Sequence, residues 1–414
     1  MMSIQIKSFP ASNGESYLVK LIGKKTNNIL IDCGYDSTAK YIINELEIIK
    51  ENKESLDLIV FTHIDNDHIN GAKKILKYII DNQYEFGEIW YNDYLKISGV
   101  KLEDTINTDK CEFIDDVADI SYKDELGIEK EGNVGYKSAT SLIEYLLNKF
   151  IKDKWNKSFK GKSINVEKGN LKRILLTEEI SIVLLAPFKS ILYEELEEWK
   201  EYLLDNVGKE VKNEKVAAAF EKYFVVLRSE EKDVQKGKCS SQEIEEMLEY
   251  NECDTDIVNR TSISFVIEYE SKKVLFLGDS SPIDIDEQLS LYITNQSSNM
   301  FDLVKVPHHG SRKNLSSKFI KKINCKNFLI STNGVMHKHP DIETIVKIIK
   351  LGNDEKKIYL NYKPNSVLEI LSSLGENFEK NLVYENESKS DKKIQDVFLW
   401  GDCYDWRNNR TNKI

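Results

Sequence analysis

The chain has 414 residues, of which 41% are hydrophobic and 31% charged, a composition that is typical of a globular protein and excludes a largely disordered one. No stretch approaches the roughly 18 consecutive apolar residues of a membrane span, so we expect a cytoplasmic protein without membrane association. With 58 basic and 69 acidic residues the net charge is −11, so a nucleic acid would have to be bound by a local basic patch or by metal ions.

Short strands are predicted at the start of the chain, within residues 3–9, 16–22 and 28–34. These segments are rich in Ile and Val or alternate, and Asn and Gly separate them, so they predict a small antiparallel sheet. Residues 56–63 (LDLIVFTH) are a nearly continuous apolar run, as expected of a strand buried on both faces. Residues 70–82 follow with apolar side chains at helical spacing, so a strand-to-helix loop lies between the two.

Further strands are predicted along the rest of the chain, within residues 88–92, 180–187, 262–279, 302–310, 327–332 and 357–362. Helical patterns at 315–323 and 341–350 separate several of these strands, which indicates an α/β fold rather than an all-β one. The histidines and aspartates that carry the chemistry discussed next fall at strand ends.

Residues 189–256 consist mainly of good helix formers, and we interpret them as a helical insertion. One apolar stripe runs along its first helix, through Leu192, Leu196, Trp199 and Leu203. The stripe either packs on the main domain or belongs to a lid or a surface for a protein partner. The predicted boundaries are 1–375 for the main domain, 189–256 for the insertion within it, and 376–414 for a C-terminal strand or tail.

Only six histidines occur in the chain, and they form three clusters: His63 and His68, His308 and His309, and His337 and His339. In the first cluster, Asp65 and Asp67 lie between the two histidines, so four candidate metal ligands share one tight loop. Asp32 ends an earlier strand in LIDCG, and Asp279 ends a later one in FLGD. The pattern predicts a metal site at strand ends.

These motifs, in this order, resemble the metallo-β-lactamase superfamily and within it most closely the C-terminal hydrolase domain of the competence protein ComEC. That domain typically shows HxDxDHxGG, an N-x-x-S segment, TGD, HHGS and a late HP. The matching positions here are His63 to Gly71, Asn259 with Ser262, Gly278 with Asp279, His308 to Ser311, and His339 with Pro340.

The resemblance implies a four-layer αββα metallo-β-lactamase sandwich, with the helical insertion added to it, and a dinuclear metal site along one edge. His63 and Asp65 would hold one divalent ion; Asp67, His68 and His309 would hold the other. Asp279 would bridge the two ions.

The resemblance also assigns residues around the metals. Asp32 would orient the metal-binding loop by contacting a ligand. His308 and His339 would be nearer the substrate and, with Asp67, would form the catalytic set. Ser311 would donate to a phosphate or cap a helix that starts near Asn314.

Two departures from the commonest superfamily pattern affect the choice of metal. Asp65 replaces a histidine, and Asn259 and Ser262 stand in the region where a third-motif histidine is usual. More oxygen ligands favour Mn²⁺ or Mg²⁺ over Zn²⁺ without excluding Zn²⁺.

A hydroxide bridging two divalent ions can attack phosphorus or a carbonyl, so we expect a metal-dependent hydrolase. The ComEC resemblance favours phosphodiester bonds in nucleic acid, hence a nuclease or phosphodiesterase. Two alternatives stay open: a small-molecule hydrolase acting on a lactone, thioester or phosphoester, and an effector subunit of a bacterial defence system that a partner regulates through the 189–256 insertion.

Overall fold

A computed structural model describes residues 2–99, 142–197, 241–335, 338–351, 356–363, 367–368, 371, 378–384 and 394–400. The predicted strands are confirmed within these ranges, with ends that differ by a few residues. Within the same ranges, no helix is both long enough and apolar enough to cross a bilayer.

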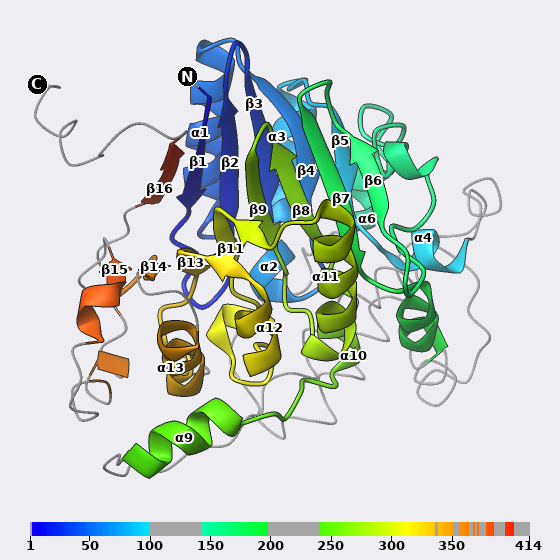
Figure 1. The fold of residues 1–414 in the computed structure, drawn as a ribbon. Coiled ribbons are helices and arrows are strands. Elements are labelled where there is room, and N and C mark those ends of the chain that lie inside the picture. Colours follow the sequence, from blue (N-terminus) through cyan, green and yellow to red (C-terminus); the bar gives the residue numbers. More distant parts are fainter. Residues whose placement is uncertain are drawn as a thin grey trace, which may run out of the picture.

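Six strands form the first sheet (Figure 1). In spatial order they are β16 (Gln395–Trp400), β1 (Ser3–Ser8), β2 (Tyr17–Ile22), β3 (Thr26–Ile31), β4 (Ser55–Val60) and β5 (Glu88–Trp90). Strands β1, β2 and β3 pair antiparallel, which confirms the antiparallel sheet predicted at the start of the chain. Strands β3, β4 and β5 pair in parallel, so their carboxyl ends share one edge of the sheet.

Eight strands form the second sheet. Their spatial order is β15 (Leu382–Tyr384), β14 (Lys357–Leu360), β13 (Asn327–Ile330), β11 (Leu303–Lys305), β9 (Lys272–Phe276), β8 (Ser264–Tyr269), β7 (Ile180–Ala186) and β6 (Lys172–Leu175). Strands β9, β11, β13 and β14 pair in parallel. A separate parallel pair consists of β10 (Met300–Phe301) and β12 (Asn324–Cys325).

Helices cover the outer face of each sheet (Figure 1). The first sheet is covered by α1 (Ala39–Glu51), α3 (Ala72–Asp81) and α6 (Leu142–Leu146), and the second by α11 (Pro282–Gln296), α12 (Ser317–Lys322) and α13 (Ile342–Lys350). Shorter helices are α2 (Asn66–Ile69), α4 (Tyr94–Ser98), α9 (Ser241–Glu249) and α10 (Ile257–Arg260), with 3-10 turns η2 (Lys157–Phe159), η3 (His308–Gly310) and η4 (Glu379–Asn381).

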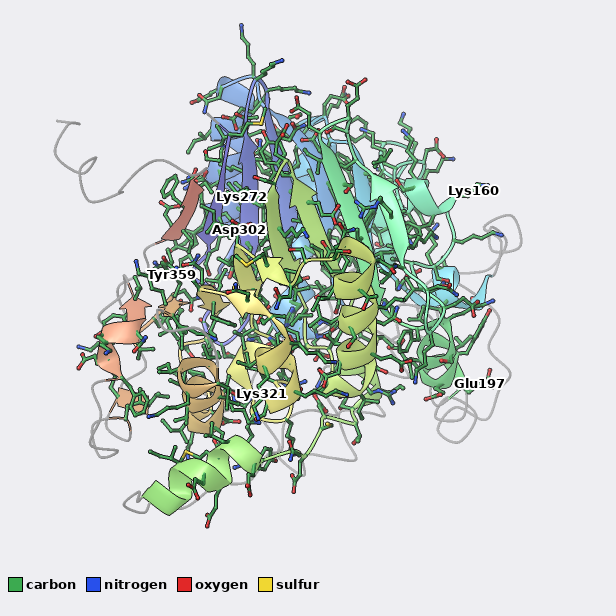
Figure 2. All side chains as sticks on the ribbon, viewed as in Figure 1. Lys160, Glu197, Lys272, Asp302, Lys321 and Tyr359 are labelled. Carbon is green, nitrogen blue, oxygen red and sulfur yellow. The ribbon has the colours of Figure 1, made fainter. Side chains whose placement is uncertain are left out.

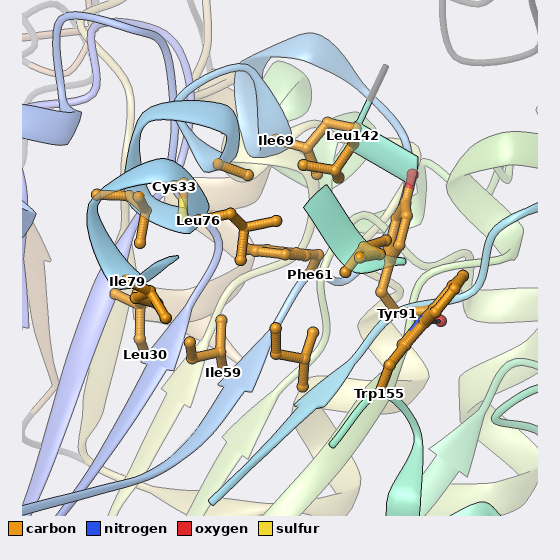
Figure 3. Close-up of a cluster of buried hydrophobic side chains, with 14 of the residues drawn as sticks. Leu30, Cys33, Ile59, Phe61, Ile69, Leu76, Ile79, Tyr91, Leu142 and Trp155 are labelled. Carbon is orange, nitrogen blue, oxygen red and sulfur yellow. Dashed lines mark hydrogen bonds between the residues drawn. The ribbon is translucent and has the colours of Figure 1, made fainter. Parts of the chain in front are cut away.

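Three apolar layers hold these elements together. The inner layer joins side chains of both sheets, for example Val19 and Ile31 from the first with Phe265 and Phe276 from the second. One outer layer packs α1, α3 and α6 on the first sheet (Figure 3), and the other packs α11, α12 and α13 on the second. The order helix, sheet, sheet, helix is the predicted four-layer αββα sandwich.

The predicted insertion is described only at its two ends, residues 189–197 and 241–256. Residues 189–197 are helical, and Leu192 and Leu196 are buried in the outer layer of the first sheet. This part of the predicted apolar stripe therefore packs on the main domain, whereas Trp199 and Leu203 lie outside the described residues. The predicted domain boundaries stay a prediction; of the last segment, β15 and β16 are described, and β16 pairs with β1.

Candidate metal centre

Five histidines from distant parts of the sequence lie side by side at the edge where the parallel strands end. Successive ring centroids are 4.2 Å apart for His63 and His68, 5.5 Å for His68 and His309, 5.7 Å for His309 and His308, and 5.6 Å for His308 and His339. They follow strands β4, β11 and β13, so the fold brings the three sequence clusters to one place. His337 lies outside the described residues.

The loop after β4 is held in shape by its backbone. The amide groups of His68 and Ile69 donate to the carbonyl oxygen of Asp65, which begins the short helix α2. Gly71 allows the loop to approach the end of β3, because a Cβ atom there would lie 2.4 Å from the carbonyl oxygen of Cys33. The loop between β1 and β2 approaches equally closely: a Cβ atom at Gly14 would lie 2.1 Å from the carbonyl oxygen of Asp67. Both glycines therefore serve close backbone contact.

Asp279, in the loop after β9, lies at the centre of the histidine cluster. Its carboxylate oxygens are 3.4 Å from His68 Nε2, 3.7 Å from His309 Nε2 and 3.9 Å from His63 Nε2. The side chain is 2% exposed, so these charges are almost out of contact with bulk water. The position suits the bridging role that the sequence predicts for Asp279.

Several groups of three residues each bring one ligand atom to within 4.8 Å of the others. They are His63, His68 and Asp279; Asp67, His68 and His309; Glu15, Asp279 and His309; and Glu15, Asp32 and His68. The predicted partition placed His63 with Asp65 at one ion, and here Asp65 Oδ2 lies 3.5 Å from His63 Nε2. His68 belongs to the group with His63 and Asp279 and also to the group with Asp67 and His309. The predicted partition assigned His68 to one ion only, so the observed geometry differs from it at this residue.

In all five of these histidines, Nδ1 faces an oxygen atom that belongs to none of the histidine side chains. His68 Nδ1 lies 2.8 Å from Asp32 Oδ2, and His309 Nδ1 lies 3.1 Å from the Ser331 carbonyl oxygen. Nδ1 of His308 and Nδ1 of His339 are each 3.3 Å from a carboxylate oxygen. A proton on Nδ1 that is donated outward leaves Nε2 as the inward ligand atom, which is the usual arrangement around a bound metal.

Asp32 supports the cluster without facing its centre. Its Oδ1 accepts from the Thr62 amide group and its Oδ2 accepts from the Thr62 hydroxyl, both at 2.8 Å, while Oδ2 also faces His68. The backbone φ of Asp32 is +55°, in the left-handed region, where the tight turn after β3 requires it. Asp32 thus contacts His68 as the predicted orienting role requires, and that role stays a prediction.

The N-x-x-S segment, Asn259 to Ser262, contacts His63 of the first histidine cluster and His308 of the second. Ser262 Oγ lies 3.3 Å from His63 Nδ1 and accepts from the Asp279 amide group at 3.0 Å. Asn259 lies in α10, and its Nδ2 donates to Asp254 Oδ2 at 2.5 Å and lies 3.4 Å from His308 Nδ1. These two residues orient histidines.

Ser311 follows η3 and is buried, and its hydroxyl accepts from the Lys313 amide group at 3.3 Å. The next helix, α12, begins at Ser317 and is capped by Ser316, whose hydroxyl accepts from the Phe319 amide group at 2.9 Å. The capping role considered for Ser311 is therefore wrong, because the chain from Ser311 to Asn314 forms a turn rather than the first turn of a helix.

Asp254 is a site residue that the sequence analysis missed. It lies just before α10, and its Oδ2 accepts from Asn259 and from Asn314 Nδ2, the latter at 3.0 Å, and faces His308 Nδ1. Hydrogen bonds and the nearby His308 hold the pKa of its carboxyl well below the usual range in spite of burial, which raises it. Asp254 lies near the end of the predicted insertion, where no motif was recognised, so nothing in the sequence marked this residue.

Glu15 and Lys305 form a second missed element, a buried ion pair beneath the cluster. Both side chains are 1% exposed, and Lys305 Nζ also donates to the Gly278 carbonyl oxygen at 2.8 Å and lies 3.8 Å from Asp279 Oδ1. Glu15 Oε1 lies 3.2 Å from His309 Nδ1. A lysine in the middle of an apolar parallel strand, as in DLVKV, was the available sequence signal, since lysine is rarely buried without a partner.

The carboxylates and imidazoles of the cluster shift one another's pKa. Burial lowers the pKa of His68, but the charges of Asp279 and Asp32 outweigh it and raise that pKa well above its usual value. Burial is also outweighed at His309, where Asp279 and two further carboxylates raise the pKa to about 10. Conversely, the histidines hold the pKa of Asp279 well below its usual range although burial raises it. Positive charge is thus strongly favoured at this site.

The donor atoms fit divalent cations. Among the residues that the structure describes, His68 Nε2 and Asp279 Oδ1 are buried without a well-directed hydrogen bond, although they lie 3.4 Å apart. Buried polar atoms normally have a partner, and a metal ion between them would supply one. Imidazole nitrogen combined with carboxylate oxygen suits Zn²⁺ and Mn²⁺.

Comparison with known proteins gives two similarities. Residues 10–102 match the family model described as Metallo-beta-lactamase superfamily. A segment of 56 residues is 36% identical to the Beta-lactamase-like protein 2 homolog of Drosophila melanogaster, and it makes up 14% of this chain and 19% of that protein. The chain thus matches about a fifth of the length of that relative. The stretch similar to the superfamily contains Glu15, Asp32 and the loop from His63 to His68.

Proposed function

We propose that this protein is a metal-dependent hydrolase that holds two divalent cations and cleaves phosphodiester bonds. The observation that carries the proposal is the excess of negative charge around the histidine cluster. Five carboxylates lie around His63, His68 and His309, four of them buried, and the only lysine among the described contacts of these three histidines and their carboxylates is Lys305. The carboxylates belong to Glu15, Asp32, Asp65, Asp67 and Asp279.

We infer the number of cations from this charge. Five carboxylates and one ammonium group give a net charge of −4 when the histidines are neutral, as metal ligands must be. An uncompensated buried charge costs several kcal/mol, so compensating cations are required. Two divalent ions would balance −4. In their absence, the raised pKa values of His68 and His309 allow protons to compensate part of it.

Two closely spaced divalent ions would lower the pKa of a water molecule and stabilise charge on the attacking and leaving oxygens. The protein's own residues supply the rest. Asp67 Oδ2 lies 3.0 Å from His309 Nε2 and is 19% exposed, so it stands between the buried ligands and the solvent. His308 is 25% exposed, with Nδ1 facing Asp254 and Nε2 3.9 Å from Asp279 Oδ2, so we place it at the solvent side of the site, where it would contact the substrate.

Phosphodiester chemistry is favoured over attack on a carbonyl by the oxygen-rich donor set, which suits the harder ions that accompany phosphoryl substrates. The motif resemblance to the ComEC hydrolase domain supports the same choice. The similarity to the superfamily over residues 10–102 supports hydrolysis in general and does not distinguish among substrates.

A panel of metals and substrates tests the proposal. Chelator-treated protein is reconstituted with Mn²⁺, Mg²⁺ or Zn²⁺ and assayed on single- and double-stranded DNA, RNA, cyclic dinucleotides, bis(p-nitrophenyl) phosphate and p-nitrophenyl acetate. We expect metal-dependent cleavage of at least one phosphodiester, and no cleavage after chelation. Hydrolysis of the carboxylic ester alone, with every phosphodiester intact under each metal, would overturn the phosphodiester assignment.

A further inference from the structure

A strongly basic segment lies between β5 and β7 of this acidic protein. Residues 149–173 contain nine basic and two acidic residues, a net charge of +7 within a chain whose net charge is −11. Eight of the nine basic side chains are exposed. We call these eight the basic strip: Lys149, Lys152, Lys157, Lys160, Lys162, Lys168, Lys172 and Arg173.

The basic strip is rigidly supported, because the same segment closes one side of the sandwich. Phe159, Ile164 and Val166 are buried in the apolar layer between the two sheets. The strand β5 is the last strand of the first sheet on this side, and β6 is the last strand of the second. The apolar side chains of the segment therefore point inward between the two sheets, and its lysines point to the solvent. Figure 2 shows Lys160 at the margin of the molecule beside β6.

Few of these charges are neutralised by the protein itself. Lys168 pairs with Glu287 at 3.0 Å and Arg173 pairs with Glu268. Lys152, Lys157, Lys160 and Lys162 form no ion pair within the part of the chain that the structure describes. Four exposed, unneutralised lysines within eleven residues produce a local positive field that attracts a polyanion.

The segment reaches the edge of the sheet where the metal centre lies. The Ile164 amide group donates to Asn92 Oδ1 at 2.7 Å, and Asn92 follows β5 by two residues. At the other end, the Ser158 amide group donates at 2.8 Å to Glu88, the first residue of β5. The segment thus runs along the whole of β5. Because Val60 of β4 pairs with Trp90 of β5, Asn92 is level with the residues that precede His63.

We propose that the basic strip binds the phosphate backbone of a nucleic-acid strand and leads it to the metal centre. Guiding a strand to the metal centre has a use only if the proposed function holds. The charges of the strip and its hydrogen bonds to the ends of β5 do not depend on that function. The competing explanation is that lysines beside β5 and β6 only protect these edge strands from pairing with other chains. That explanation requires no affinity for nucleic acid, so binding separates the two.

The test measures the affinity for a fluorescein-labelled 30-nucleotide single-stranded DNA by anisotropy over a range of salt concentrations, without added metal. The variant changes Lys152, Lys157, Lys160 and Lys162 to Gln. We expect this variant to bind the DNA at least tenfold more weakly at about 100 mM salt. The slope of log affinity against log salt concentration should become shallower by about 0.7 for each phosphate that the protein no longer neutralises. Changing the same four lysines to Arg preserves the charge and should preserve the affinity.

The matched control changes Lys24, Lys25, Lys50 and Lys53 to Gln. These four lysines are exposed near the end of the first sheet where β3 and β4 begin. The control variant has the same net charge as the strip variant. It should lose less than threefold in affinity. Three results would overturn the inference. The two variants could lose DNA affinity equally, or the strip variant could bind DNA as tightly as the wild type. The third is that the strip is needed for binding to phosphatidylserine vesicles and not for binding to DNA.

Hydrolysis of bis(p-nitrophenyl) phosphate separates this inference from the proposed function. The strip residues do not touch the metal centre, so both Gln variants should turn over the small ester at the wild-type rate. If the wild type cleaves the ester and binds no DNA, the strip is not a nucleic-acid surface and the proposed function stands. If the wild type binds DNA through the strip but cleaves no phosphodiester with any metal, the strip is a nucleic-acid surface and the proposed function is wrong.

Discussion

The two edges of the sandwich differ in how completely the hydrogen bonds of their charged side chains are satisfied. At the edge where β9 and β11 begin, Lys272 Nζ pairs with Asp302 Oδ1 at 2.8 Å, and Asp302 Oδ2 accepts from the Lys273 amide group at 2.8 Å (Figure 2). Both partners are partly exposed. Each oxygen of the carboxylate has a donor, and the pair needs nothing further from the protein or from a ligand.

At the edge where the same strands end, Asp279 is buried and lies 3.4 to 3.9 Å from four histidines, and one of its oxygens makes no well-directed hydrogen bond within the described residues. Around His63, His68 and His309, carboxylates outnumber lysines by five to one within the described residues. A ligand site is therefore recognised by buried polar atoms that have no hydrogen-bond partner in the protein, rather than by the number of its ion pairs.

The largest effect is expected from Asp67→Ala, which removes a carboxylate from the metal edge. Hydrolysis should fall about a thousandfold or more, because loss of one member of a catalytic unit disables the whole. The fold should persist, since Asp67 lies in the short helix α2 and its side chain is partly exposed rather than part of an apolar layer. Initial rates with the best metal and substrate, together with circular dichroism, measure both effects.

Asp81→Ala is the control for this prediction, because Asp81 ends α3 on the surface and is 55% exposed. That variant should keep the wild-type rate. A folded Asp67→Ala protein with wild-type turnover would show that the histidine cluster is not the catalytic centre.

The same substitution made at both edges sharpens the comparison. Asp279→Asn should lower the metal content from two ions per chain to one or none, because a carboxylate between the histidines is lost. Asp302→Asn should leave two ions bound and lower the free energy of unfolding by about 1 kcal/mol, since it weakens one partly exposed charged pair.

Metal analysis after dialysis and urea unfolding measure these two quantities in each variant. Two ions bound to a folded Asp279→Asn protein would rule out a bridging role for Asp279. Loss of metal from Asp302→Asn would show that the two edges are not independent.

The smallest effect is expected from Glu268→Gln, near the end of β8 and away from the metal centre. Burial raises the pKa of Glu268, but hydrogen bonds from Arg173, Tyr292 and Ser181 outweigh it and hold the pKa below its usual value. A lowered pKa in the folded state stabilises the protein above the pKa of the unfolded chain, about 4.3, and this stabilisation is lost as the pH falls through the folded pKa.

At pH 7 the Gln variant should therefore be less stable by about 0.5 to 1 kcal/mol, because solvent screens this partly exposed group. The difference should shrink below about pH 4. Urea unfolding of both proteins at several pH values measures it. A difference that stays constant, or grows, in acid would contradict the assignment of Glu268 to this charged network.

Local patterns were sufficient for the longer strands and for the motif loop, whereas the short strands β6, β10 and β12 were not predicted. The run from Leu56 to Val60 predicted a buried strand because both faces of a parallel strand meet apolar layers. The helix α1 and the helix α11 were not predicted. In α11, the buried face combines Asp284 and Gln288 with apolar residues, so its hydrophobic periodicity is weak.

The residues that surround the histidines were harder to predict than the histidines themselves. Asp254, Glu15 and Lys305 lie outside any motif, and each acts through a contact with a residue far away in the sequence, as between Lys305 and Glu15. A buried lysine has a function only in relation to its partner, and the partner is not encoded nearby.

The sequence by itself determined the α/β class, the order of the strands along the chain and the chemical nature of the histidine and aspartate clusters, because these depend on short-range periodicity and residue type. Only the tertiary structure decided which ring nitrogen of each histidine faces inward, that Asp279 lies among four histidines, and that the basic segment 149–173 lies beside β5 and β6. These features depend on how parallel strands stack and where their ends meet, which is set by packing between segments hundreds of residues apart.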